Sequence, residues 1–248
     1  MRIKTTHIAA SSKALVPGLL LLVIFIFIIS MKKPVHNDQS MVKGYTYLAL
    51  GDSYTIGEQV ASKENFPSQV TTLLTEKGIV FGEPEIIART GWTTGELKTA
   101  INQSKLRERY DLVTLLIGVN NQYRGKNTDD YSPEFESLLK QAIHFAGNDA
   151  SRVVVLSIPD WGVTPFAEGR DRTEIAKEID AYNTVNKRIA ATYKVHYINV
   201  TQSTREAAMD ASRLTSDGLH PSDKEYRLWA EEIVSFIKSK PDYWHPLL

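Results

Sequence analysis

The chain has 248 residues, of which 42% are hydrophobic and 23% are charged, a composition typical of folded globular proteins. Its 29 basic and 29 acidic residues balance, so there is no overall positive charge to bind nucleic acid. The absence of cysteine excludes disulfides, thiolate metal ligands and a cysteine nucleophile. The charges are unevenly spread, because residues 1–40 carry five basic side chains and one acidic one.

The N-terminal segment is strongly apolar and reads LLLLVIFIFII over residues 19–29. Extended back to Ala14, it is about 16 residues long, which is short for a membrane-spanning helix and long for the apolar part of a signal peptide. No pair of small residues marks a cleavage site after it. This favours an uncleaved signal anchor in residues 1–30 over a removed signal peptide.

The basic residues before the apolar segment orient the chain across a membrane. They place the following domain outside the cytoplasm, in the periplasm or on the cell surface, or secreted if the segment is cleaved. The membrane is therefore an expected partner through this helix. Residues 31–43 are polar and predict a short linker, and residues 44–248 are then a single domain.

Within this domain, strand-like and helix-like segments alternate. Short apolar runs predict strands at residues 45–50, 85–88, 112–117, 153–158 and 195–200. Amphipathic spacing predicts helices at residues 65–77, 93–103, 132–146, 173–193 and 222–238. Several of these strands are apolar on both faces, so we expect an α/β fold of three layers, α/β/α, around a five-stranded parallel sheet with right-handed crossovers.

Four of the predicted helices have a start signal in the sequence, the first of them Asn65-Phe66-Pro67. Thr93 and Glu96 form a T-x-x-E capping box, and Ser222 and Glu225 form an S-x-x-E capping box. The Ser-Pro pair at residues 132–133 predicts the start of the helix at residues 132–146.

Reactive side chains follow the predicted strands. Gly51-Asp52-Ser53 follows the first strand, Gly91 the second, Gly118-Val119-Asn120 the third, and Asp217-Gly218-Leu219-His220 lies beyond the fifth. In a parallel sheet the carboxyl ends of the strands share one edge, where chemistry gathers. A hydroxyl, an imidazole that activates it, a carboxylate that orients the imidazole and donors for an oxyanion are the parts of an acyl-transfer site.

Each of these short patterns is weak alone. A G-D-S triplet is common in turns, because all three residues favour them. An acyl-transfer site is indicated by the order of the four segments and by their common position after strands.

Together the four segments resemble the SGNH, or GDSL-type, serine hydrolase superfamily. LALGDSYTIGE at residues 48–58 is similar to its first block, Gly91 falls at its glycine block, GVNN at residues 118–121 is similar to its G-x-N-D block, and DGLHPS at residues 217–222 to its D-x-x-H block. The resemblance covers residues 45–240. It implies a flavodoxin-like three-layer fold and metal-free ester hydrolysis, so neither a cofactor nor a metal is expected.

The resemblance also implies a role for each matching residue. Ser53 is the nucleophile and a backbone oxyanion donor, and Gly91 and Asn120 donate to the same oxyanion. His220 is the general base and then the general acid, and Asp217 orients it. The sequence departs from the family at Asn121, where an aspartate is usual, and we interpret this residue as support for the loop.

Other enzyme classes fit less well. The α/β-hydrolase pattern G-x-S-x-G fails at Ser53, because Thr55 occupies the place of the second glycine. A phosphate-binding P-loop and a dinucleotide-binding fingerprint are absent, and no H-x-x-x-H pair suggests a metal.

Aromatic residues after the strands predict the substrate pocket. Trp92, Tyr123 and Trp161 are candidates for an acyl pocket or a sugar platform, with closure of the sheet edge as the purely structural alternative. We expect a serine ester hydrolase acting on a small-molecule, lipid or glycan ester. A polysaccharide O-acetylesterase or acyltransferase is an alternative, and a non-catalytic, membrane-tethered binding domain is another. The oligomeric state is left open.

Overall fold

The centre of the fold is a five-stranded parallel sheet in the order β2-β1-β3-β4-β5. The computed structural model describes residues 44–207, 209–240 and 244. The strands are β1 (Tyr47–Asp52), β2 (Glu85–Arg89), β3 (Leu112–Leu116), β4 (Val153–Leu156) and β5 (His196–Ile198). The predicted five-stranded parallel sheet is therefore confirmed.

The central strands are buried on both faces, which explains their continuous apolar sequences. Every residue of β1, β3 and β4 is buried. β1 lies between β2 and β3, with Asp52 opposite Arg89 on one side and Gly51 opposite Leu116 on the other. The carboxyl end of β1 is thus in the middle of the sheet edge, where neighbouring strands bring their own loops beside it.

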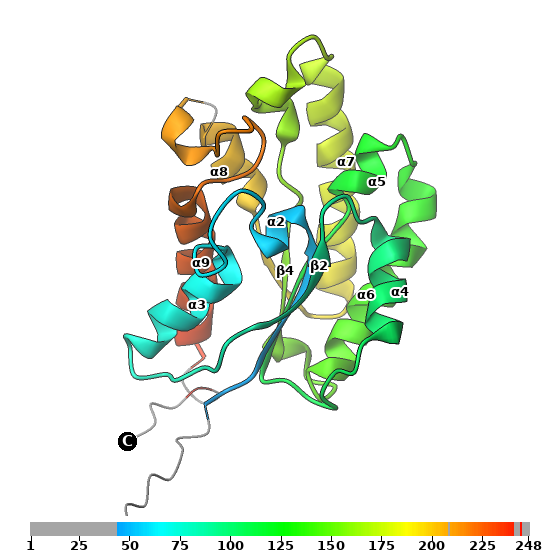
Figure 1. Cartoon of the computed structure of the whole chain (residues 1–248). Helices are drawn as coiled ribbons and strands as arrows, with labels where there is room; N and C mark the ends of the chain where they lie inside the picture. The colour runs from blue at the N-terminus through cyan, green and yellow to red at the C-terminus, as the bar shows by residue number, and fades with distance from the viewer. Residues whose placement is uncertain (1–43, 208, 241–243, 245–248) are drawn as a thin grey trace, which may run out of the picture. The chain divides into compact units, whose positions relative to one another are not determined.

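Helices cover the two faces of the sheet (Figure 1). α3 packs against α9 on one face, whereas α4 and α7 flank α6 on the other, which gives the three predicted layers. The helices are α2 (Ser53–Ile56), α3 (Phe66–Thr75), α4 (Thr94–Gln103), α5 (Val119–Tyr123), α6 (Thr128–Phe145), α7 (Arg172–Thr192), α8 (Val200–Ala207) and α9 (Asp223–Lys238). Short 3-10 turns are formed by Ala150–Arg152, Trp161–Val163, Pro165–Ala167 and Ala211–Arg213.

The predicted start of one helix is wrong. The Ser-Pro pair at residues 132–133 does not begin α6, which starts at Thr128 after Asn127, whose side chain accepts a hydrogen bond from the backbone N–H of Asp130 at 2.8 Å. Asparagine is a strong N-cap and adds a turn before the proline.

The capping box predicted at Ser222 is also wrong, although α9 does begin directly after this residue. Its partner Glu225 is fully buried and bonds Arg213 at 2.6 Å, and Ser222 donates instead to the carbonyl of Ser212. Glu225 therefore forms an ion pair with Arg213 instead of capping the start of α9. The box at Thr93 and Glu96 is present as predicted.

The last predicted strand is shorter than its apolar run. β5 ends at Ile198, and the chain enters α8 at Val200. The predicted signal anchor and linker lie outside the described residues. Among the residues that are described, none of the helices has the length and apolar character needed to cross a membrane.

Candidate active site

The turn between β1 and α2 presents Ser53 at the sheet edge. Asp52 is the last residue of β1 and the N-cap of α2, and its Oδ1 accepts a hydrogen bond from the backbone N–H of Tyr54 at 3.1 Å. Ser53 follows as the first residue of the helix. A strand and a helix that meet without an intervening loop hold this hydroxyl on rigid backbone.

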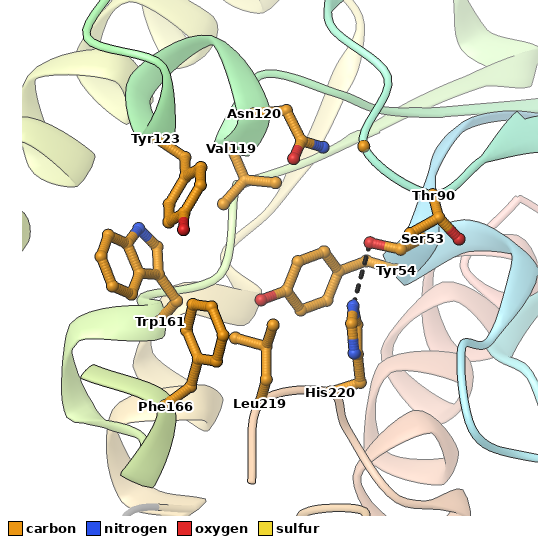
Figure 2. Close-up of a pocket in the computed structure, with 11 residues that line it drawn as sticks. Ser53, Tyr54, Thr90, Val119, Asn120, Tyr123, Trp161, Phe166, Leu219 and His220 are labelled. Atoms are coloured by element: carbon orange, nitrogen blue, oxygen red, sulfur yellow. Dashed lines mark hydrogen bonds between the residues drawn. The ribbon is translucent and has the colours of Figure 1, made fainter. Parts of the chain in front are cut away.

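Three side chains predicted to act together are joined by hydrogen-bond contacts. The Oγ of Ser53 lies 3.0 Å from the Nε2 of His220, a contact drawn as a dashed line in Figure 2. The other ring nitrogen, Nδ1, lies 2.7 Å from the Oδ2 of Asp217. Ser53 and His220 are 167 positions apart in the sequence, and both are buried. The fold therefore brings the predicted hydroxyl, imidazole and carboxylate into one chain of contacts.

The loop before α9 fixes the carboxylate of Asp217. Its second oxygen, Oδ1, accepts hydrogen bonds from the backbone N–H groups of Leu219 and His220 at 2.9 and 3.0 Å, and from the hydroxyl of Thr215 at 2.8 Å. Burial opposes ionisation, but these bonds and the one to the imidazole outweigh it and lower the pKa of Asp217 to about 2. The group facing the imidazole is thus an anion at neutral pH.

Gly91 and Asn120 line the same pocket as Ser53. Gly91 lies in the turn after β2 with a φ of 82°, a conformation that favours glycine. Its carbonyl accepts a hydrogen bond from Arg124 at 2.5 Å, and this guanidinium also pairs with Glu96 at 3.3 Å. Arg124 is not among the residues that line this pocket, so the carbonyl of Gly91 is held by a residue outside it.

Asn120 is positioned by a tight turn between β3 and α5. Gly118 in this turn has a φ of 133°, and a Cβ atom there would come within 2.6 Å of the Tyr131 hydroxyl, so a larger residue does not fit. The Nδ2 of Asn120 donates to the carbonyl of Trp92 at 3.1 Å and lies 3.4 Å from the Oδ2 of Asp52. The carboxamide is thereby tied to the end of β1 and to the turn after β2.

Asn121 supports the loop. It is fully buried, its Oδ1 accepts from the backbone N–H of Thr94 at 3.0 Å, and its Nδ2 donates to the hydroxyl of the same residue at 2.7 Å. These bonds join the start of α4 to α5. The residue that departs from the family pattern therefore fills a structural place next to Asn120.

A second carboxyl group lies directly before Ser53 in the chain. Asp52 is fully buried, and burial raises its pKa to about 7, although hydrogen bonds from Tyr54 and Asn120 favour the ionised form. Sequence patterns give no sign of this, because an aspartate before a serine is an ordinary turn residue.

A mainly apolar pocket of about 180 Å³ opens beside Ser53. Tyr123 and Trp161 line it as predicted, whereas Trp92 lies in a neighbouring hollow with Glu96 and Arg124. The other lining residues are Tyr54, Thr90, Gly91, Val119, Asn120, Phe166, Leu219 and His220.

Four lining residues, Tyr54, Thr90, Val119 and Leu219, were not predicted from the sequence. Each is the immediate chain neighbour of a predicted site residue. Adjacency in the chain to a predicted site residue was therefore the feature of the sequence that could have identified them. Across the residues that the structure describes, no group of three or more histidine, aspartate or glutamate side chains is arranged to hold a metal ion.

Comparison with known structures shows the same fold. The lipase/acylhydrolase from Enterococcus faecalis matches with a TM-score of 0.60 and 23% identity over 82% of this chain and 99% of that one. Axe2, an acetylxylan esterase from Geobacillus stearothermophilus, matches with a TM-score of 0.61 and 18% identity over 79% of this chain and 94% of that one. The esterase EstA from Pseudoalteromonas sp. matches with a TM-score of 0.57 and 18% identity over 80% of this chain and 99% of that one.

No curated protein sequence matches the chain significantly. The family model of the GDSL-like lipase/acylhydrolases, in contrast, matches residues 49–228. This match begins in β1, ends in α9 and includes all four segments identified in the sequence. The chain therefore belongs to the GDSL-like lipase/acylhydrolase family and is an ester-hydrolysing enzyme.

Proposed function

We propose that the enzyme cleaves carboxylic esters through a covalent acyl-enzyme on Ser53, with His220 as general base and Asp217 as its orienting carboxylate. The observation that carries this proposal is the continuous chain of contacts from the Oγ of Ser53 through His220 to Asp217, at 3.0 and 2.7 Å. Such distances allow a proton to move from the hydroxyl to the imidazole in one step.

In the first half of the reaction, the Oγ of Ser53 attacks the ester carbonyl carbon while its proton passes to the Nε2 of His220. The resulting oxyanion accepts hydrogen bonds from the backbone N–H groups of Ser53 and Gly91 and from the side chain of Asn120, whose Nδ2 gives up its longer contact, 3.4 Å, with Asp52. The carbon–oxygen bond to the alcohol then breaks, and the imidazolium protonates the departing alkoxide. The product of this half is an ester of Ser53.

In the second half, water replaces the alcohol. The water oxygen attacks the carbonyl carbon of the acyl-enzyme while His220 takes a proton from the water. His220 then returns this proton to the Oγ of Ser53 as the carboxylic acid leaves. Asp217 is ionised at neutral pH, so it keeps the proton of the imidazole on Nδ1 and stabilises the imidazolium formed in both halves.

The direct test replaces Ser53 with alanine and measures hydrolysis of a p-nitrophenyl acetate and butyrate pair. We expect kcat to fall by about 10⁴-fold or more. The matched control is Ser62→Ala, since Ser62 is an exposed serine outside the site. A serine-directed phosphonate should label the wild type at Ser53, and labelling elsewhere, together with full activity of Ser53→Ala, would refute the proposal. A non-catalytic binding domain predicts neither labelling nor turnover.

A second candidate is removal of acetyl groups from a carbohydrate, by hydrolysis or by transfer to another sugar hydroxyl. The support is the similarity of fold to Axe2 and to AlAXEase, both of which are acetyl xylan esterases. The test is release of acetate from acetylated xylooligosaccharides, with and without an unacetylated sugar as acceptor. Acetylated acceptor among the products identifies transfer, and no reaction with any acetylated sugar rules this candidate out.

A further inference from the structure

The pocket beside Ser53 has a mainly apolar lining, and the hydroxyl of Tyr54 is one of the few polar groups inside it. Figure 2 shows Tyr54 extending from Ser53 along the pocket, between Val119 and Leu219. At the far end, three aromatic side chains close the pocket with ring centroids 5.3 to 6.2 Å apart, namely Tyr123, Trp161 and Phe166. A substituent that enters from Ser53 therefore passes the Tyr54 ring before it reaches the aromatic wall.

The hydroxyl of Tyr54 points into this space. Its side chain is 3% exposed, and among the described residues the hydroxyl has no hydrogen-bond partner. The hydroxyls of Thr55 and Tyr226 also lack partners but are enclosed by protein, whereas that of Tyr54 opens toward the aromatic wall. By comparison, the indole N–H of Trp161 is already bonded to Gln122 at 2.7 Å.

This hydroxyl remains a neutral donor. Burial, and then the negative charges of Asp52, Asp217 and Asp160, raise the pKa of Tyr54 far above neutrality. The ring itself lies against the His220 imidazole, with centroids 5.2 Å apart, so the phenol is held in place beside the reacting group. A fixed neutral hydroxyl in an apolar pocket can donate one hydrogen bond and accept another.

We propose that Tyr54 is a specificity-determining residue whose hydroxyl binds a polar atom of the substituent that enters this pocket. The inference rests on the proposed function, because it assumes that the ester is cleaved at Ser53. It identifies the substrate as an ester with an amphipathic substituent, which has an apolar body and one hydroxyl, ether or carbonyl oxygen.

The physical basis is the cost of leaving the phenol unpaired. A wholly apolar substituent would cover the hydroxyl without bonding it, and such a mismatch lowers binding roughly 10- to 100-fold. The size of the substituent follows from the pocket, since an apolar cavity of about 150 Å³ holds benzene. At about 180 Å³, this pocket fits roughly six to eight non-hydrogen atoms.

The polar atom can belong to the acyl chain or to the alcohol part of the ester. Two pairs of substrates distinguish these two possibilities. The acyl pair is p-nitrophenyl hexanoate and its analogue with one methylene replaced by an ether oxygen. The alcohol pair is cyclohexyl acetate and the monoacetate of a cyclohexanediol. Acid release gives kcat/KM for each substrate, and the ratio within a pair measures the preference for the polar atom.

We expect the wild type to prefer the oxygen-bearing member of one pair by roughly tenfold or more. Tyr54→Phe keeps the ring and removes the hydroxyl, so it should raise kcat/KM for the apolar member and lower it for the other. Loss of structure would instead lower both values. Tyr193→Phe is the control, because Tyr193 bonds Glu136 at the far end of α7 and should leave both ratios unchanged.

If Tyr54→Phe leaves both ratios within about twofold of wild type while hydrolysis continues, the hydroxyl does not recognise substrate and this inference is overturned. Failure of the proposed function is distinguishable, because the wild type would then hydrolyse neither the four esters nor p-nitrophenyl acetate.

Discussion

Replacing Asp217 with asparagine should disable His220 while leaving the loop in place. The Oδ1 atom of Asp217 accepts three hydrogen bonds, so an asparagine keeps its carbonyl oxygen there and must turn its NH₂ group toward Nδ1. The NH₂ group then donates to Nδ1, and the imidazole carries its proton on Nε2, pointing at Ser53. In this tautomer His220 cannot accept the serine proton.

The opposite orientation of the asparagine amide in this variant is much less stable. It would place an NH₂ group against three donors and lose three hydrogen bonds, each contributing about 0.5–1.5 kcal/mol. The wrong tautomer therefore dominates, and we expect kcat to fall by about 10⁴-fold, or ~5 kcal/mol in activation free energy. The assay is steady-state hydrolysis of p-nitrophenyl butyrate near neutral pH, with thermal unfolding followed by circular dichroism to check the fold.

The matched control is Asp171→Asn. Asp171 caps α7 by accepting from the backbone N–H groups of Thr173 and Glu174, and asparagine caps helices equally well. This variant should keep wild-type turnover. If Asp217→Asn is folded and its kcat stays within about tenfold of wild type, the tautomer argument is refuted, because the orienting carboxylate would then be dispensable.

Two further predictions concern stability. Because burial raises the folded-state pKa of Asp52 from 3.8 to about 7, its contribution to stability is present at low pH and lost as pH rises from about 4 to 7. Relative to Asp52→Asn, urea unfolding of the wild type should therefore lose up to ~4 kcal/mol between about pH 4 and pH 8, and a pH-independent difference would contradict the argument. Arg213→Met leaves the carboxylate of Glu225 buried and without its cation, so it should cost about 3–5 kcal/mol in urea unfolding. Arg227→Met breaks an exposed pair with Glu231 and should cost less than about 1 kcal/mol; equal losses would show that burial does not set the cost.

The sheet was predictable from sequence because the pattern of apolar residues in a strand depends on whether its faces are buried. A strand such as β3 is apolar at consecutive positions, which occurs where both faces are covered. The candidate site was predictable for a related reason: parallel strands end at one edge, so residues that follow different strands meet there. The order of these segments, together with the family resemblance, therefore predicted that Ser53 and His220 lie close together, and their side chains are 3.0 Å apart.

Other features depend on contacts that no local pattern contains. Glu225 occupies a capping-box position, but it is buried and bonds the guanidinium of Arg213 instead of the helix terminus. α8 is rich in serine and threonine, which are poor helix formers, and packing against α9 helps to hold it as a helix. Trp92 has the expected residue type, but the turn after β2 places its ring outside the pocket.

The packing of α3 against α9 ties an early part of the chain to a late one. Phe66 of α3 meets Trp229 of α9, with ring centroids 6.1 Å apart, and the two helices lie side by side in Figure 1. His220 is supplied by the loop that leads into α9. In the proposed mechanism Ser53 needs His220 to activate it, and Ser53 leaves the ribosome 167 residues before His220 does, so a growing chain has the hydroxyl without its base. On the proposed mechanism, activity therefore requires that α9 has docked against α3 and brought the loop with His220 to Ser53.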